Sequence, residues 1–258
     1  MDNSNPVPPR IPPPYAQPAA APPREPLGVR PEEREPICGA VTAVDAILRT
    51  PRRVMYQVRQ PGPGQLILGM IFIVVLCSLI YGVVVGTFSN GTQLWAAPAK
   101  IAGGLLVSAL ICLPSLYIFT CLSGSQARLA EICGLLAGML LLTSILLIGF
   151  APVAWLFSQS TDSVVWMGTL HLLFWFIATV FGLRFLDHAF TDSQARSKAG
   201  LNTWMLIFVL VVLQMTTALR PIVGTASTFL PQEKKFFVAY WGDCLKPAVE
   251  GAPPQGNR

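Results

Sequence analysis

Residues 66–88 read LILGMIFIVVLCSLIYGVVVGTF and contain no charged side chain. A helix that crosses the hydrocarbon core of a bilayer needs about 20 predominantly apolar residues, and this run supplies them. The breaker sequence PGPG, residues 61–64, stands directly before it. The run therefore predicts a membrane-spanning helix that starts immediately after a break in the chain.

Four further apolar runs follow along the rest of the chain. The chain is 53% apolar and only 12% charged, with a mean hydropathy of +0.56, whereas soluble domains carry about 25% charged residues. Short connections between the runs favour antiparallel neighbours. We predict an all-α, polytopic transmembrane bundle of about five spans over residues 65–223. The predicted spans are residues 66–88, 101–122, 132–157, 164–186 and 204–220.

The N-terminal part of the chain has a different composition. Residues 1–36 contain 12 of the 23 prolines and almost no large aliphatic side chains. Such a segment buries too little surface to offset its ordering entropy, so residues 1–38 are predicted to form a disordered, proline-rich tail. Within it, residues 12–15 (PPPY) match the PPxY pattern that WW-type modules bind; the alternative is a solvated tail that contains a tyrosine by chance.

Residues 39–60 predict two short amphipathic helices, separated at Thr50-Pro51. Their apolar side chains recur at helical spacing, at Val41, Val44, Ile47 and Leu48 and again at Val54, Met55 and Val58. Four basic side chains surround this stripe: Arg49, Arg52, Arg53 and Arg59. Two interpretations stay open. The helices lie at the membrane interface with their arginines on anionic headgroups, or they dock on the spans of the protein itself.

The distribution of basic residues predicts the orientation. If the arginines before the first span are cytoplasmic, then loops 123–131 and 187–203 with Arg128, Arg196 and Lys198 are cytoplasmic too. The loop with Lys100 then lies on the opposite side. This bias predicts a cytoplasmic N-terminus and a short non-cytoplasmic tail over residues 224–258. Tryptophans at span ends predict an aromatic belt: Trp95, Trp155, Trp166, Trp204 and Trp241.

Two pairs of glycines have GxxxG spacing, Gly82 with Gly86 and Gly134 with Gly138. Glycines at this spacing let two helix backbones approach closely, which promotes association of spans. We predict that both pairs serve packing within the bundle, and a homodimer face is the alternative.

Polar or helix-breaking residues inside spans are the candidates for a functional site, because burying polar groups in lipid is costly. They are Pro114, His171, Gln214 and Arg220. Pro114 interrupts the second span, as broken helices do at transporter binding sites. His171 has no acidic partner within a span, so a hydrogen bond to a neighbouring helix is a better interpretation than a proton relay.

Motifs of enzymes and metal sites are missing from the sequence. It contains no G-x-S-x-G, Walker A or HExxH sequence, no CxxC pair among six cysteines, and only two histidines. We therefore predict no catalytic residue, cofactor or metal. No nucleic-acid-binding motif accompanies the net charge of +5, which basic span flanks explain. The predicted partners are the lipid bilayer and either another copy of the chain or other membrane proteins.

A resemblance adds an expectation about function. The segment AILRTPRRV, residues 46–54, resembles the run that precedes the first span in bacterial Yip1-domain proteins. A proline-rich leader, five spans and a short outer tail are also similar to that family. The resemblance implies a non-enzymatic scaffold or membrane-assembly factor and, by preference, a bacterial inner membrane. The Asp-Leu-Tyr-Gly-Pro signature of eukaryotic trafficking members is absent. The alternative is a permease-type transporter subunit that works with a separate ATPase.

Overall fold

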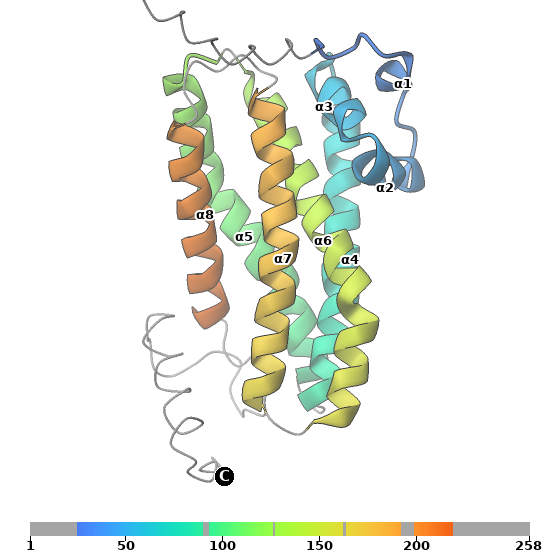
Figure 1. The fold of residues 1–258 in the computed structure, drawn as a ribbon, viewed down its shortest axis with the longest axis vertical. Helices are drawn as coiled ribbons and strands as arrows, with labels where there is room; N and C mark the ends of the chain where they lie inside the picture. Colours follow the sequence, from blue (N-terminus) through green and yellow to red (C-terminus); the bar gives the residue numbers. More distant parts are fainter. Residues whose placement is uncertain (1–24, 90–92, 126, 162–163, 192–198, 219–258) are drawn as a thin grey trace, which may run out of the picture.

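The structure is a computed structural model, and it describes residues 25–89, 93–125, 127–161, 164–191 and 199–218. All regular elements within these residues are α-helices. The five longest are α4 (Gly64–Ser89), α5 (Gln93–Leu122), α6 (Leu129–Ser160), α7 (Val164–Thr191) and α8 (Ala199–Ala218). By length and apolar composition each can cross a membrane, which confirms the prediction of an all-α, five-span membrane bundle (Figure 1).

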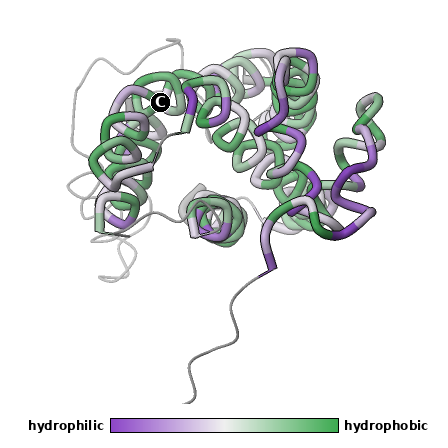
Figure 2. The backbone as a smooth tube through the Cα atoms, turned by 90° about the horizontal axis from the view of Figure 1, so that it is seen from above, coloured by the Kyte–Doolittle hydropathy of each residue, from purple (hydrophilic) through white to green (hydrophobic). Residues whose placement is uncertain are grey.

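Helix α6 is the central element of the bundle. Two thirds of its most apolar stretch is buried, whereas at most one third is buried in each of the other spans. It packs on α4 and on α7, while α5 packs on α4 and α8 packs on α5. The main helix pairs therefore run in the order α7, α6, α4, α5, α8, and Figure 2 shows this arrangement from above. Helices α7 and α8 stand at the two ends of the series.

Three short helices lie at the end of the bundle where α4 begins (Figure 1). They are α1 (Pro31–Arg34), α2 (Ala40–Arg49) and α3 (Pro51–Arg59). We call residues 25–60 the N-terminal cap.

The apolar face of the cap is buried on the spans of the same chain. Its buried side chains join the main hydrophobic core and include Ala46, Ile47, Met55 and Val58. Helices α2 and α3 both contact α6, and α2 also contacts α4. Of the two interpretations left open for residues 39–60, the structure shows docking on the spans of the protein itself.

Helix α5 begins earlier than the hydropathy of the sequence indicates. Its first residue is Gln93 rather than Ile101, so Lys100 lies in the second turn of the helix and not in a loop. Lys100 is also buried, with 2% of its surface exposed. The placement of Lys100 in a loop was wrong, because the helix already includes the polar and proline residues that precede the apolar run. Helix α6 likewise continues without interruption through Pro152 to Ser160.

Several predictions fall on residues outside the described part of the chain. These are most of the proline-rich tail, including the PPPY motif at 12–15, the candidate Arg220 and the C-terminal tail 224–258.

Candidate functional site

A buried tyrosine–histidine pair connects two spans inside the bundle. The Tyr81 hydroxyl of α4 lies 2.8 Å from Nδ1 of His171 on α7. Tyr81 is fully buried and His171 is 6% exposed, and their rings meet edge to face. With the phenol as donor, the neutral imidazole carries its proton on Nε2. This hydrogen bond matters for the architecture because α4 and α7 otherwise join mainly through α6.

Aromatic and small side chains surround this pair. His171 meets the edge of Phe174, which in turn stacks on Phe150 of α6 at a ring distance of 4.7 Å. Among the described side chains, only His171 Nε2 and Ser78 Oγ are buried polar atoms without a hydrogen-bond partner. Ser78 precedes Tyr81 by one helical turn. The pair is thus the polar centre of an otherwise apolar cluster.

Lys100 lies at a similar depth. At 1.5 Å per helical residue, Tyr81 lies about 12 Å from the end of α4, and Lys100 and His171 each lie about 10 Å from the start of their helices. All three positions belong to the end of the bundle opposite the cap. Lys100 takes part in a polar or electrostatic interaction of its own. This end of the bundle therefore contains three buried polar side chains on three different spans.

Three of the four predicted GxxxG glycines, Gly82, Gly134 and Gly138, pack against other parts of the same chain. A Cβ atom on Gly82 would collide with the backbone of Pro98 in α5. A Cβ on Gly134 would collide with Val58 of the cap, and a Cβ on Gly138 would lie 2.9 Å from the ring of Phe185 in α7. In α6, Gly134 therefore contacts the cap and Gly138 contacts α7.

Helix α5 continues through Pro114, so the predicted interruption of this span was wrong, and the backbone just before Pro114 is a contact point for α8. Pro114 itself is exposed on α5, and the backbone carbonyl of Cys112 accepts hydrogen bonds from the Ser115 hydroxyl and from the indole N–H of Trp204, the latter at 2.9 Å. Trp204 is fully buried and stacks on Phe208. The expectation that Trp204 belongs to an aromatic belt was therefore wrong, because its indole satisfies a carbonyl inside the protein. Trp95, Trp155 and Trp166 are exposed.

The structure does not bring the predicted polar residues together in one site. His171 lies inside the bundle, Pro114 lies on the outer surface of α5, and Gln214 is a half-buried residue of α8. The fourth, Arg220, lies outside the described residues. Of these residues, His171 contacts a polar side chain of another span, Tyr81 of α4.

A second polar centre holds the N-terminal cap together. Arg52 of α3 donates from Nε to Glu33 of α1 at 2.6 Å, and the Glu33 side chain is only 4% exposed. The backbone N–H of Gly28 donates to the other oxygen of the same carboxylate. Gly28 has a φ of +86°, and the ring of Tyr56 fills the space where a side chain would stand. A residue other than glycine would therefore be strained and would clash at this position.

This environment favours the ionised form of the Glu33 carboxyl. Burial raises the pKa of its carboxyl, but the hydrogen bonds from Arg52 and the Gly28 N–H and the positive charges of Arg52 and Arg30 outweigh burial. The pKa of Glu33 therefore lies below its ordinary value of 4.5. The carboxylate is ionised at neutral pH and connects α1 to α3.

Arg59 connects the cap to the spans. Its Nε donates to Glu131 of α6 at 2.8 Å, and its guanidinium also donates to the carbonyl oxygen of Ala189 in α7 at 3.2 Å. Arg53 donates to the carbonyl oxygens of Glu35 and Pro36 within the cap. Three of the four predicted membrane-surface arginines, Arg52, Arg53 and Arg59, are thus engaged by the protein.

Arg49 is the exception among the four. Its side chain is 81% exposed and pairs only with Asp45, one turn earlier on α2. Of the predicted basic cluster, Arg49 alone is thus oriented in a way that suits contact with lipid headgroups.

Sequence reasoning missed Tyr81, although a signal for it exists. A phenol within an aliphatic span needs a hydrogen-bond partner, because its hydroxyl cannot be hydrated in lipid. His171 is one of only two histidines in the chain, so the sequence marks both side chains as groups that need partners without pairing them with each other. Glu33 and Glu131 offered a weaker signal, since nothing local distinguishes them from solvated carboxylates.

The described residues contain no group of three or more His, Cys, Asp or Glu side chains placed to hold a metal ion. Comparison with known proteins provides no relative for the chain: no protein-family model, no curated protein and no solved structure matches it.

Proposed function

We propose that this protein is a non-enzymatic, Yip1-like membrane scaffold or assembly factor. The observation that carries the proposal is the Tyr81–His171 hydrogen bond, which uses the polar side chains of two spans to connect helices. A polar interaction of this kind strengthens association between spans in lipid. The hydroxyls of Thr143 and Ser144 donate to backbone carbonyls of α6 itself, and the Thr143 hydroxyl also lies 3.5 Å from the carbonyl oxygen of Ala178 in α7. The interior polar groups thus support a fixed helix arrangement.

The cap supports the same proposal from the other end of the bundle. Arg59 connects α3 to two spans, and Val58 packs directly on Gly134. A segment held in this way offers a folded surface at the membrane boundary that partner proteins can bind. We place the cap on the cytoplasmic side on the basis of the basic residues near the span ends. We place the protein in a bacterial inner membrane on the basis of its resemblance to bacterial Yip1-domain proteins.

The test is affinity purification of the full chain in mild detergent, followed by mass spectrometry and sizing of the co-eluting proteins. A scaffold should co-elute with membrane proteins or with further copies of itself, without a nucleotidase. A stoichiometric ATPase would overturn the proposal and favour the permease-subunit alternative. An Arg59→Gln variant serves as a second measurement, because loss of partners on loosening the cap would place their binding surface there.

A further inference from the structure

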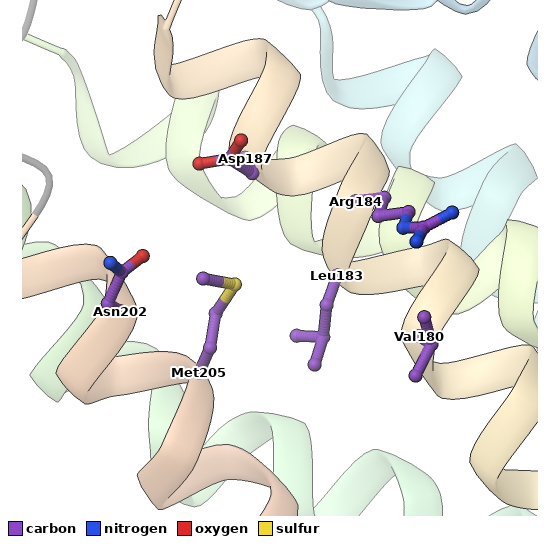
Figure 3. A pocket seen from close by; sticks show the side chains of 6 residues that line it. All are labelled: Val180, Leu183, Arg184, Asp187, Asn202 and Met205. Carbon is purple, nitrogen blue, oxygen red and sulfur yellow. The ribbon is translucent and has the colours of Figure 1, made fainter.

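A groove separates α7 from α8 near the end of the bundle that bears the cap. It has a volume of about 450 Å³. It exists because the two helices pack on different neighbours, α7 on α6 and α8 on α5. Its lining residues are Val180, Leu183, Arg184, Asp187, Asn202 and Met205, and Figure 3 shows them.

The lining changes from polar to apolar with depth. At 1.5 Å per residue, Asp187 lies about 6 Å from the end of α7 and Asn202 about 5 Å from the start of α8. Val180 lies about 16 Å from the end of α7. Helix α7 is about 42 Å long, which exceeds the hydrocarbon core of about 30 Å by about 6 Å at each end. With α7 centred in the bilayer, Asp187 lies at the boundary between the headgroups and the hydrocarbon core, and Asn202 lines the same groove from α8. The apolar residues lie deeper, in the layer of the acyl chains.

We propose that this groove binds a zwitterionic phospholipid, with an ethanolamine headgroup between Asp187 and Asn202. The carboxylate of Asp187 accepts hydrogen bonds from the ammonium group, and the Asn202 amide donates to the phosphate. An acyl chain lies along Val180, Leu183 and Met205. The groove thus matches both charges of the headgroup and the apolar tail.

Two details of the lining bear on this arrangement. Asp187 already takes part in another interaction, but a carboxylate has about four lone-pair sites and accommodates an ammonium donor in addition. In Figure 3 the guanidinium of Arg184 extends away from α8, and it lies 5.9 Å from the centre of the Phe181 ring. Its long, exposed side chain is at the rim, where it can turn toward a phosphate. Arg184 therefore adds affinity for any phospholipid, whereas Asp187 selects for the ammonium group.

The inference concerns a lipid site and is independent of the scaffold proposal. It is tested with the full chain in nanodiscs that contain diazirine-labelled phosphatidylethanolamine or phosphatidylglycerol with identical acyl chains. After irradiation, mass spectrometry locates the labelled peptides. Peptides that contain residues 180–187 and 202–205 should carry about three- to five-fold more label from phosphatidylethanolamine. The exposed face of α4 at Leu68 and Phe72 should show no headgroup preference.

Variants distinguish a headgroup site from ordinary lipid contact. Asp187→Asn should abolish the preference, so that the two lipids label the groove peptides equally. Asp45→Asn, on the exposed face of α2, should leave the preference unchanged. Asn202→Leu should lower the labelling of the groove peptides, because the phosphate loses its donor. An unchanged preference in Asp187→Asn, or a preference for phosphatidylglycerol in the unaltered protein, would overturn the proposal. Unlabelled groove peptides in a chain that elutes as a dimer would overturn it too and assign the groove to a second copy.

Discussion

The contact between Gly134 and Val58 tests how the cap is seated on the spans. A Cβ atom at position 134 would collide with one methyl group of Val58, lie 2.9 Å from the other and lie 3.2 Å from the Val58 Cβ. Val58 is 1% exposed, so its side chain has no open space into which it can turn. In Gly134→Ala the cap must therefore move away from α6. Overpacking of this kind costs about 1–3 kcal/mol.

Removal of the obstructing methyl groups should compensate for this change. Val58→Ala alone loses two buried methyl groups, worth about 1.6 kcal/mol of transfer free energy. In the double variant, the new Cβ at position 134 fills the space that those methyl groups leave. We expect Gly134→Ala with Val58→Ala to cost no more than Val58→Ala alone. The two substitutions should therefore couple by about 1–3 kcal/mol in the stabilising direction.

The assay is amide hydrogen exchange of α3 in detergent or nanodiscs, because exchange reports local opening of the cap. A cost of about 1–3 kcal/mol speeds exchange of protected amides by about 5- to 150-fold in Gly134→Ala. Gly149→Ala, on the same helix as Gly134, is the matched control. A Cβ at position 149 meets no neighbouring part of the protein within 4 Å. Exchange in the double variant equal to the product of the two single effects would show that Val58 does not lie over Gly134 and would refute the reasoning.

Three further predictions concern the polar contacts. Tyr81→Phe should lower the free energy of unfolding of the purified bundle by about 0.6–2 kcal/mol, because the buried histidine loses its partner. Tyr117→Phe, on the exposed surface, should leave it unchanged, and equal effects of the two substitutions would argue against the pair. The depressed pKa of Glu33 means that its contribution is fully present above pH 4.5, the ordinary value, and is lost as pH falls through the lower folded value. Limited proteolysis of the N-terminal cap should therefore speed up in acid below pH 4.5 in the unaltered protein, and Glu33→Gln should be rapidly cleaved at neutral pH with little further change in acid. Arg59→Gln should speed proteolysis of the cap at neutral pH, because it removes the ion pair with Glu131. Arg49→Gln should not, since an exposed helical pair contributes only about 0.3–0.5 kcal/mol. Faster proteolysis in Arg49→Gln than in Arg59→Gln would contradict the role of Arg59 in holding the cap on the spans.

The spans could be predicted from the sequence because hydrophobic length is a local property. Residues 66–88 are long enough and apolar enough to identify themselves without knowledge of any contact. The start of α5 could not be predicted in this way. Pro98 and Lys100 lower the local hydropathy, and only the close approach of Gly82 to Pro98 shows why this segment belongs inside the bundle.

Partners of polar side chains were the part that the sequence could not supply. His171 was identified as a polar group within a span, but its partner is 90 residues away in the chain. For Arg59 the sequence left open whether it meets lipid headgroups or the spans of the protein itself, and its partner Glu131 is 72 residues away. Composition shows that such groups need partners, because unpaired polar groups in lipid are costly. Only the packing of the helices determines which residues become those partners.

The positions of the basic residues in the structure support the orientation that we propose for the protein. The arginines of the cap lie at one end of the bundle together with Arg128 at the start of α6, whereas Lys100 lies near the other end. Acidic residues neutralise several cap arginines, but the positive-inside rule counts Lys and Arg rather than net charge. We therefore expect the cap to face the cytoplasm.

Cys38 provides the test of this orientation, because it is an exposed cysteine of the cap. A membrane-impermeant maleimide should leave Cys38 unlabelled in intact cells and should label it once the membrane is permeabilised. A Cys38→Ser variant identifies the signal from this position. Labelling of Cys38 in intact cells would place the cap outside, and the arginine-bearing end of the bundle would then contradict the positive-inside rule. In that case we would regard Arg52, Arg53 and Arg59 as structural residues, whose role is to hold their carboxylate and carbonyl partners in place.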